Sequence, residues 1–214
     1  MFQYKDLKKI LKQDNSGLPS VKVALVGDTA TQFLATAIQG MGVEHGYHID
    51  LFEAEYNQVE RQFLDPTSDL YKFDADIIVV FQSTHKLGEH HSTLSVEQQS
   101  ALADERLSFV ASICENPAFA NKKIIYFNYA EIEDTVFGSY ANKVSSSLSY
   151  QVRKLNYELM NLSQQYPNLF ICDIAGLQNK FGRDFMFAPN VYVSTEMILS
   201  VDALPYVASR VMDI

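Results

Sequence analysis

Short apolar runs alternate with longer amphipathic segments along most of this chain. Five of the runs contain no glycine or proline and are predicted to be strands, namely Val21–Val26, His48–Phe52, Ile77–Phe81, Ile124–Phe127 and Leu169–Cys172. Several of them are apolar at nearly every position, which is typical of strands that are buried on both faces of a parallel sheet. The pattern therefore predicts a sheet that is covered by helices on both sides.

The segments between these runs repeat their apolar residues at the spacing of a helix. The clearest stripe steps by three or four residues through Val144, Leu148, Val152, Leu155, Leu159 and Leu162. Strands that alternate with helices form β-α-β units with right-handed crossovers. We therefore expect an α/β fold, a three-layer α/β/α sandwich with a five-stranded parallel sheet in the flavodoxin-like order 2-1-3-4-5.

The chain is expected to form one main domain with a short extension before it. Its 214 residues, 47% of them hydrophobic, are enough to bury one substantial core. Apolar residues at helical spacing over Phe2–Leu11 precede the polar stop Asp14–Gly17. We assign residues 1–20 to an amino-terminal helical arm and residues 21–214 to a single α/β domain.

The charge and composition of the chain exclude several classes of partner. A formal net charge of −9 and a pI near 5.0 argue against binding to nucleic acid or to an anionic membrane, since both need clustered lysine and arginine. No apolar stretch is long enough to span a bilayer, and no signal peptide is recognised. Cys114 and Cys172 lie in apolar segments and are expected to be free thiols, which favours a cytoplasmic location.

The first predicted strand ends in a turn that has the right position for a binding site. Gly27, Asp28 and Thr29 follow it directly, and the loops beyond the carboxyl ends of parallel strands form the crevice where ligands bind. Thr29–Gln32 also matches a capping box, which would give these residues a purely structural role. The Asp28 carboxylate would repel a phosphate, and the glycine-rich motifs of nucleotide sites are missing, so we expect no cofactor.

Two resemblances arise from these residues. Gly27-Asp28-Thr29 resembles the first block of the SGNH (GDSL-type) hydrolases, and four longer stretches resemble the amino-terminal, SGNH-hydrolase-like domain of FkbH-like proteins: VALVGDTATQFL, FNYAEIEDTVFGSYAN, LNYELMNL and MILSVDALPYVASRV. In that family such a domain precedes a phosphatase-like domain of the haloacid dehalogenase (HAD) superfamily, and members activate or transfer small acyl groups. The resemblance implies a small-molecule or acyl substrate, and a carrier protein or a carboxyl-terminal HAD-like domain as partner.

The hydrolase resemblance implies a nucleophile at Thr29, framed by Gly27 and Asp28. A threonine hydroxyl needs a base to accept its proton. The final Asp-x-x-His block of the hydrolases is absent, and no histidine follows His91. His85 is the remaining candidate base, in the segment Gln82–Thr93, which is expected to be an irregular loop.

Two amides are candidates for stabilising an oxyanion or binding a ligand carbonyl. Gln82 lies where the hydrolases have the block Gly-x-Asn-Asp, and Asn128 follows the fourth strand. Asn128 is alternatively a turn residue that satisfies its own backbone. The cluster of His85, Glu89, His90 and His91 is explained by a solvated loop, so no metal site is predicted.

The sequence leaves two functional hypotheses. The first is an accessory amino-terminal domain of an FkbH-like phosphatase or acyl-transfer protein, without a complete triad, that binds a metabolite, an acyl group or a carrier protein. The second is an active esterase or acyltransferase that uses Thr29 as nucleophile and His85 as base. A base within reach of Thr29 would distinguish them, and whether the chain is an enzyme stays open at this stage.

Overall fold

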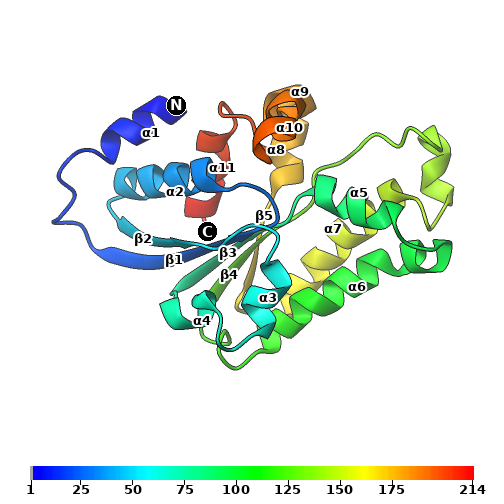
Figure 1. Cartoon of the computed structure of the whole chain (residues 1–214), viewed down its shortest axis with the longest axis horizontal. Helices are drawn as coiled ribbons and strands as arrows, with labels where there is room; N and C mark the ends of the chain where they lie inside the picture. The colour runs from blue at the N-terminus through cyan, green and yellow to red at the C-terminus, as the bar shows by residue number, and fades with distance from the viewer. Residues whose placement is uncertain (1) are drawn as a thin grey trace.

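The computed structural model describes residues 2–214 and has five parallel strands at its centre (Figure 1). They are β1 (Ser20–Gly27), β2 (His48–Glu53), β3 (Ile77–Phe81), β4 (Lys123–Phe127) and β5 (Leu169–Cys172). Their order across the sheet is β2-β1-β3-β4-β5, and every neighbouring pair is parallel. The predicted fold class and strand order are confirmed.

Helices cover both faces of the sheet, which gives the three predicted layers (Figure 1). One layer contains α1 (Tyr4–Ile10), α2 (Gln32–Glu44), α8 (Ile174–Phe181) and α11 (Leu204–Met212). The other contains α3 (Val59–Leu64), α4 (Asp69–Phe73), α5 (Thr84–Ser92), α6 (Val96–Glu115) and α7 (Leu148–Gln165). The short helices α9 (Arg183–Met186) and α10 (Pro189–Thr195) follow α8, and the 3-10 helix η1 (Gly138–Lys143) precedes α7.

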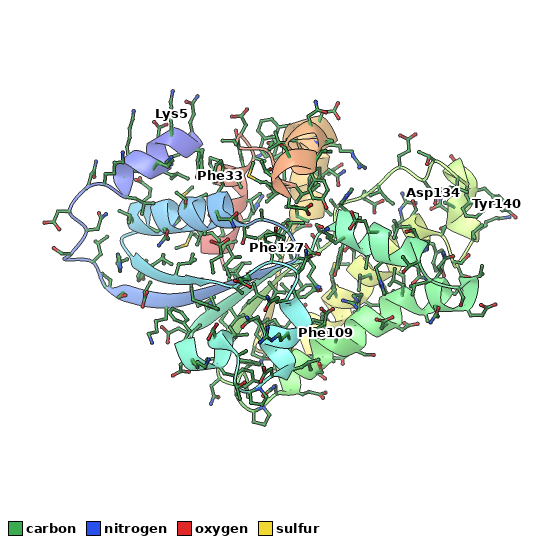
Figure 2. All side chains as sticks on the ribbon, in the orientation of Figure 1. Lys5, Phe33, Phe109, Phe127, Asp134 and Tyr140 are labelled. Atoms are coloured by element: carbon green, nitrogen blue, oxygen red, sulfur yellow. The ribbon has the colours of Figure 1, made fainter. Side chains whose placement is uncertain are left out.

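The strands supply both hydrophobic cores because their side chains alternate between the two faces of the sheet. In β1, Val23 and Leu25 pack in the core beneath α2 and α11, whereas Ala24 and Val26 pack in the core beneath α6 and α7. Figure 2 shows Phe127 of β4 in the interior between the layers. The near-continuous apolar runs in the sequence follow from this burial on both sides.

The amino-terminal arm packs against the same core as the rest of the chain. Leu7 of α1 is fully buried, and the ring of Tyr4 stacks on Phe33 of α2 with 5.3 Å between the ring centroids. Gly40 of α2 lies directly beneath Leu7 and leaves room for this close approach. Residue 1 of the expected 1–20 arm lies outside the described residues.

Two local predictions near the site are wrong. The segment Gln82–Thr93 is not an irregular loop, because α5 forms there once the Ser83 hydroxyl accepts a hydrogen bond from the Lys86 amide and caps the first turn. The capping box at Thr29–Gln32 does not form, since α2 begins at Gln32 and its N-cap, Thr31, makes no capping bond. The Thr31 hydroxyl donates instead to Glu53 of β2, at 2.6 Å.

Other features of the sequence have the expected structure. Cys114 and Cys172 are both buried free thiols. Ser95 and Gln98 form a capping box at the start of α6. None of the helices in residues 2–214 combines the length and the apolar content needed to cross a bilayer.

The docking of α1 can be tested at Gly40. A Cβ atom at this position would lie 2.7 Å from the Leu7 Cβ and 2.9 Å from the Leu7 carbonyl oxygen. Alanine is normally about 1 kcal/mol better than glycine inside a helix. Here the clash should reverse the sign, and Gly40→Ala should lower the free energy of unfolding by about 1–3 kcal/mol in urea titrations.

Gly88→Ala in α5 is the matched control, since its added Cβ would meet only the end of the flexible Leu148 side chain, at 3.0 Å. This variant should be as stable as the wild-type protein or more so. Equal stability of the two alanine variants would show that α1 is not held against α2 as described.

Candidate functional site

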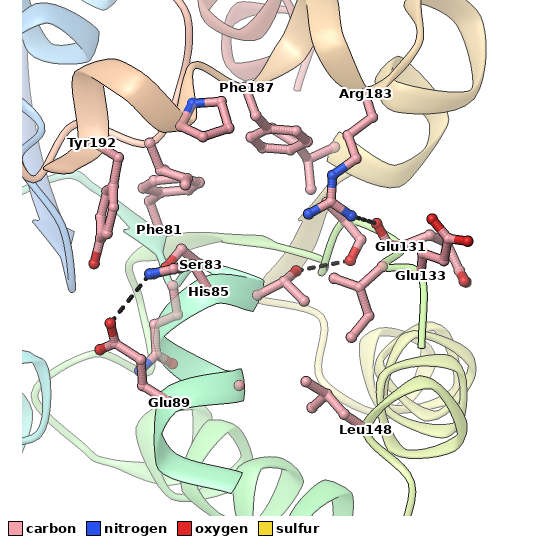
Figure 3. A pocket seen from close by; sticks show the side chains of 18 of the residues that line it. Phe81, Ser83, His85, Glu89, Glu131, Glu133, Leu148, Arg183, Phe187 and Tyr192 are labelled. Atoms are coloured by element: carbon pink, nitrogen blue, oxygen red, sulfur yellow. Dashed lines mark hydrogen bonds and ion pairs between the residues drawn. The ribbon is translucent and has the colours of Figure 1, made fainter. Parts of the chain in front are cut away.

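A large cavity lies at the carboxyl edge of the sheet, over β3, β4 and β5. Its volume is about 630 Å³, and its lining includes Phe81 at the end of β3, Asn128 after β4 and Ile174 after β5 (Figure 3). The segment that carries α9 and α10 forms the opposite wall, with Phe187 and Tyr192. We call this space the main cavity. Its place is where a parallel α/β sheet is expected to bind ligands.

The main cavity has apolar walls and a charged rim. The apolar lining includes Phe81, Ile132, Leu148, Ile174, Phe187 and Ile198. The ionisable side chains of the lining are His85, Glu89, Glu131, Glu133, Arg183 and Asp184. Pockets that are largely apolar with a few polar groups are typical of small-molecule sites.

Acidic groups outnumber basic ones at this rim. Glu89 is compensated by Lys86 at 3.1 Å and Glu131 by Arg153 at 3.0 Å. Glu133 and Asp184 make no ion pair within residues 2–214. A strongly anionic ligand group would therefore be repelled at this rim.

Thr29, the implied nucleophile, is closed off from the main cavity. Its relative exposure is 0%, and its hydroxyl has no hydrogen-bond partner among the described residues. The Ala30 amide donates to the carbonyl of Glu196 at 3.0 Å, so the segment after α10 lies across this loop. No base among the described residues is hydrogen-bonded to this hydroxyl.

His85, the implied base, lies elsewhere on α5. Its ring packs edge-on against Tyr192, with 4.3 Å between the ring centroids, and its Nε2 lies 3.2 Å from a Glu89 oxygen (Figure 3). The side chain is 44% exposed. The structure does not bring His85 and Thr29 together as a catalytic pair.

Asp28 holds together the loops that follow β1 and β3. Its two carboxylate oxygens accept hydrogen bonds from the Ser83 amide at 2.8 and 3.0 Å. Burial raises the pKa of Asp28 to about 7, although the hydrogen bonds from Ser83 oppose this shift. Gly27 permits the tight turn beside it, because a Cβ there would lie 2.7 Å from a methyl carbon of Thr31.

The two candidate amides are used differently. The Gln82 carbonyl oxygen accepts a hydrogen bond from Tyr126 at 2.6 Å, and Gln82 also lines the main cavity. The Asn128 amide nitrogen donates to Asp173 at 2.7 Å, and its oxygen accepts from the Ala175 amide at 3.1 Å. Asn128 thus lines the cavity while it fixes the turn into α8, and its contact with a ligand stays a prediction.

Several charged residues at the site were not found from the sequence. Lys86 of α5 lies 3.1 Å from Glu89 and 3.3 Å from Glu196, which joins α5 to the segment after α10. Burial opposes the charge on Lys86, but the nearby Tyr192 hydroxyl and the two carboxylates outweigh it and raise its pKa. Lys86 therefore stays protonated at neutral pH and cannot replace the missing histidine as a base.

Residues 2–214 contain no group of three or more histidine, cysteine, aspartate or glutamate side chains that is arranged to hold a metal ion.

Two threonines near the site allow a matched test of this geometry. Thr29→Val removes a buried hydroxyl that has no partner, so it should raise the free energy of unfolding by about 1 kcal/mol. Thr31→Val removes the hydrogen bond to Glu53 and should lower it by about 1–3 kcal/mol. Chemical denaturation of both variants measures the two signs, and a loss of stability in Thr29→Val would contradict the described burial.

The buried carboxyl of Asp28 should make stability depend on pH. Because its pKa is raised on folding, its contribution is fully present below pH 3.8 and is lost as the pH rises to about 7. Asp28→Asn keeps an oxygen for the Ser83 amide but does not titrate. Between pH 5 and pH 8 the free energy of unfolding should fall by about 2–3 kcal/mol more in the wild-type protein than in this variant. Parallel pH profiles would contradict the raised pKa.

Comparison with known proteins places this geometry in a family. A search of curated proteins gives no match. The amino-terminal part of the protein BF1531 from Bacteroides fragilis, a crystal structure that contains a phosphatase domain complexed with Mg, is 58% identical with a TM-score of 0.96. The similarity covers 100% of this chain and 56% of that chain, so this chain spans little more than half of the relative.

More distant structures share the fold. The lipase Lip_vut3 from a goat rumen metagenome has a TM-score of 0.61 at 10% identity, over 90% of this chain and 96% of that chain. The acetyl xylan esterase AlAXEase has a TM-score of 0.57 at 16% identity, over 90% and 98%. These similarities establish an SGNH-hydrolase-like fold. The model of a family described as FkbH, N-terminal domain, matches residues 22–214, and the chain therefore belongs to this family.

Proposed function

We propose that this chain is an accessory amino-terminal domain of an FkbH-like protein that binds an acyl-bearing small molecule in the main cavity and does not hydrolyse it. The observation that carries the proposal is the separation of two features that a hydrolase would combine. The cavity that can receive a substrate lies over β3 to β5, whereas Thr29 is buried outside its lining.

The size and walls of the main cavity support an acyl ligand. A volume of about 630 Å³ is within the range of small-molecule sites. Phe81, Phe187 and Ile198 offer apolar surface to a hydrocarbon chain, and burial of that surface would drive binding. Arg183 and the backbone near Glu131 provide polar contacts at one end of the cavity (Figure 3).

The charge of the rim supports an uncharged acyl group over a phosphorylated metabolite. Glu133 and Asp184 have no counter-charge among the described residues, and Arg183 is the single arginine of the lining. A phosphate would add two negative charges beside these carboxylates. An ester, thioester or amide of a small acid adds none and keeps a carbonyl that can accept hydrogen bonds.

The absence of a base supports binding without catalysis. General-base assistance contributes roughly 10²–10⁴-fold to such reactions, and neither His85 nor the protonated Lys86 is hydrogen-bonded to Thr29. We infer that the acyl group is passed to another part of the protein or to a carrier. A carboxyl-terminal HAD-like domain is the partner we favour, because the Bacteroides fragilis relative contains a phosphatase domain.

Binding can be followed with an introduced tryptophan, because the chain contains none. Phe187→Trp places the reporter in the lining of the main cavity, and Tyr140→Trp places it on the exposed η1. Hexanoyl-N-acetylcysteamine, an uncharged acyl thioester, should change the emission of the first variant saturably and leave the second unchanged. Equal responses from both variants would contradict binding in the cavity.

Gly88 provides the matched control for occupancy of the cavity. In the Phe187→Trp background, Gly88→Leu should weaken binding by at least about 10-fold, because its side chain enters the cavity, whereas Gly88→Ala should not. Release of free thiol should stay at the uncatalysed rate throughout. Thiol release that is lost in Thr29→Val would instead establish the active-hydrolase alternative.

A further inference from the structure

Residues 188–198, which include α10, form one wall of the main cavity (Figure 3). An isolated antiparallel bridge between Phe187 and Leu199 joins the two ends of this segment. Beside the bridge, the Ser200 amide donates to the Met186 carbonyl at 2.9 Å. The segment is thus a single loop that is tied together at its base, and we call it the flap.

The helix of the flap packs on the domain through one buried side chain. Among the seven residues of α10, Tyr192 alone is buried. Val191 is 37% exposed and Val193 is 85% exposed, although both side chains are apolar. Burial of apolar surface provides most of the free energy that holds a helix in place. A segment with so little of it opens at a lower free energy than the core does.

Glu196 fastens the flap to the rest of the domain. Its carbonyl accepts a hydrogen bond from the Ala30 amide at 3.0 Å, and its carboxylate lies 3.3 Å from the Lys86 ammonium group. The Glu196 side chain is 40% exposed, and ion pairs that water can reach contribute little to stability. Glu196 also has a φ of 57°, in the left-handed region that residues other than glycine seldom adopt. Release of this contact would relieve the backbone strain.

The closed flap leaves buried polar atoms without hydrogen bonds. Residues 2–214 contain four buried side-chain polar atoms without a hydrogen-bond partner, and three of them belong to Thr29, Tyr192 and Glu196. The Glu196 oxygen still lies in its ion pair with Lys86, whereas the fully buried Thr29 hydroxyl has no partner. Buried polar groups are nearly always hydrogen-bonded, and an open flap would expose these atoms to water. The contacts of the closed flap are therefore incomplete.

We propose that the flap is a lid that opens about its base while the bridge between Phe187 and Leu199 stays intact. Opening separates Glu196 from Ala30 and Lys86, and it removes one wall of the main cavity. The lid then serves as the entrance through which a ligand reaches the cavity. The opening follows from the contacts of the flap alone, whereas its role as an entrance rests on the function proposed above.

Hydrogen exchange of single amides, followed by NMR, tests the opening without any ligand. The Ala30 amide donates to Glu196 of the flap, whereas the Asp28 amide donates to the Phe81 carbonyl of β3 at 3.2 Å. After correction for intrinsic exchange rates, the Ala30 amide should exchange at least about 10-fold faster than the amides of Asp28 and Ser200. Equal protection of Ala30 and Asp28 would show that the flap does not open separately, and would overturn the proposal.

Two variants of α10 identify the flap as the moving part. Tyr192→Ala removes its buried side chain and should speed the exchange of the Ala30 amide by at least about 10-fold, with Asp28 unchanged. Val193→Ala, at an exposed position of the same helix, is the control and should exchange as the wild-type protein does. If Tyr192→Ala does not fold, Glu196→Gln, which removes the ion pair with Lys86, provides the same test. Unchanged exchange in the folded variant overturns the proposal.

Stopped-flow fluorescence then tests whether the lid is the entrance. In the Phe187→Trp background, Tyr192→Ala should raise the association rate constant of hexanoyl-N-acetylcysteamine by at least about 3-fold over that of Val193→Ala. Equal association rate constants would overturn the role of the flap as an entrance. If the thioester does not bind to the Phe187→Trp protein at all, the proposed function fails, and hydrogen exchange of Ala30 still decides whether the lid opens.

Discussion

The hydrogen bonds between the Asp28 carboxylate and the Ser83 amide are the contact on which the site depends. They join the loop after β1 to the first turn of α5, and they do so in a buried position where the carboxylate cannot be solvated. The geometry of this contact places Gln82 and Ser83 in the lining of the main cavity. It also sets the position of α5, and with it the positions of His85 and Lys86.

The walls and the rim of the main cavity determine the chemistry that it can support. The main cavity is large, apolar and acidic at its rim, which suits an uncharged acyl group. In a hydrolase with this fold the residue after Gly27-Asp28 would have to reach a substrate, and here Thr29 is instead sealed beneath the segment that carries Glu196.

Most of the fold could be predicted from the sequence, because a strand that is buried on both faces has an almost continuous apolar sequence. The apolar runs of β1 and β3 and the apolar stripe along α7 contain the side chains that are buried on folding. Such patterns can be recognised from short stretches of the sequence. The helix α5 was missed because its sequence is polar, and it is held by the Ser83 cap and by the burial of Leu87.

Lys86 and Glu196 were missed for a different reason, because 110 residues of chain separate them and only the folded structure brings them together. The positions of Gly27, Asp28 and Gln82 at the carboxyl ends of strands were predictable from topology alone, but the hydrogen-bond partners of Asp28 and Gln82 were not.

A crystal structure of the chain soaked with hexanoyl-N-acetylcysteamine tests the central claim most directly. The account predicts an intact thioester in the main cavity, with its hydrocarbon chain against Phe81 and Phe187 and with the Thr29 hydroxyl unmodified. An acyl group bonded to the Thr29 oxygen, or a ligand bound away from this cavity, would contradict it.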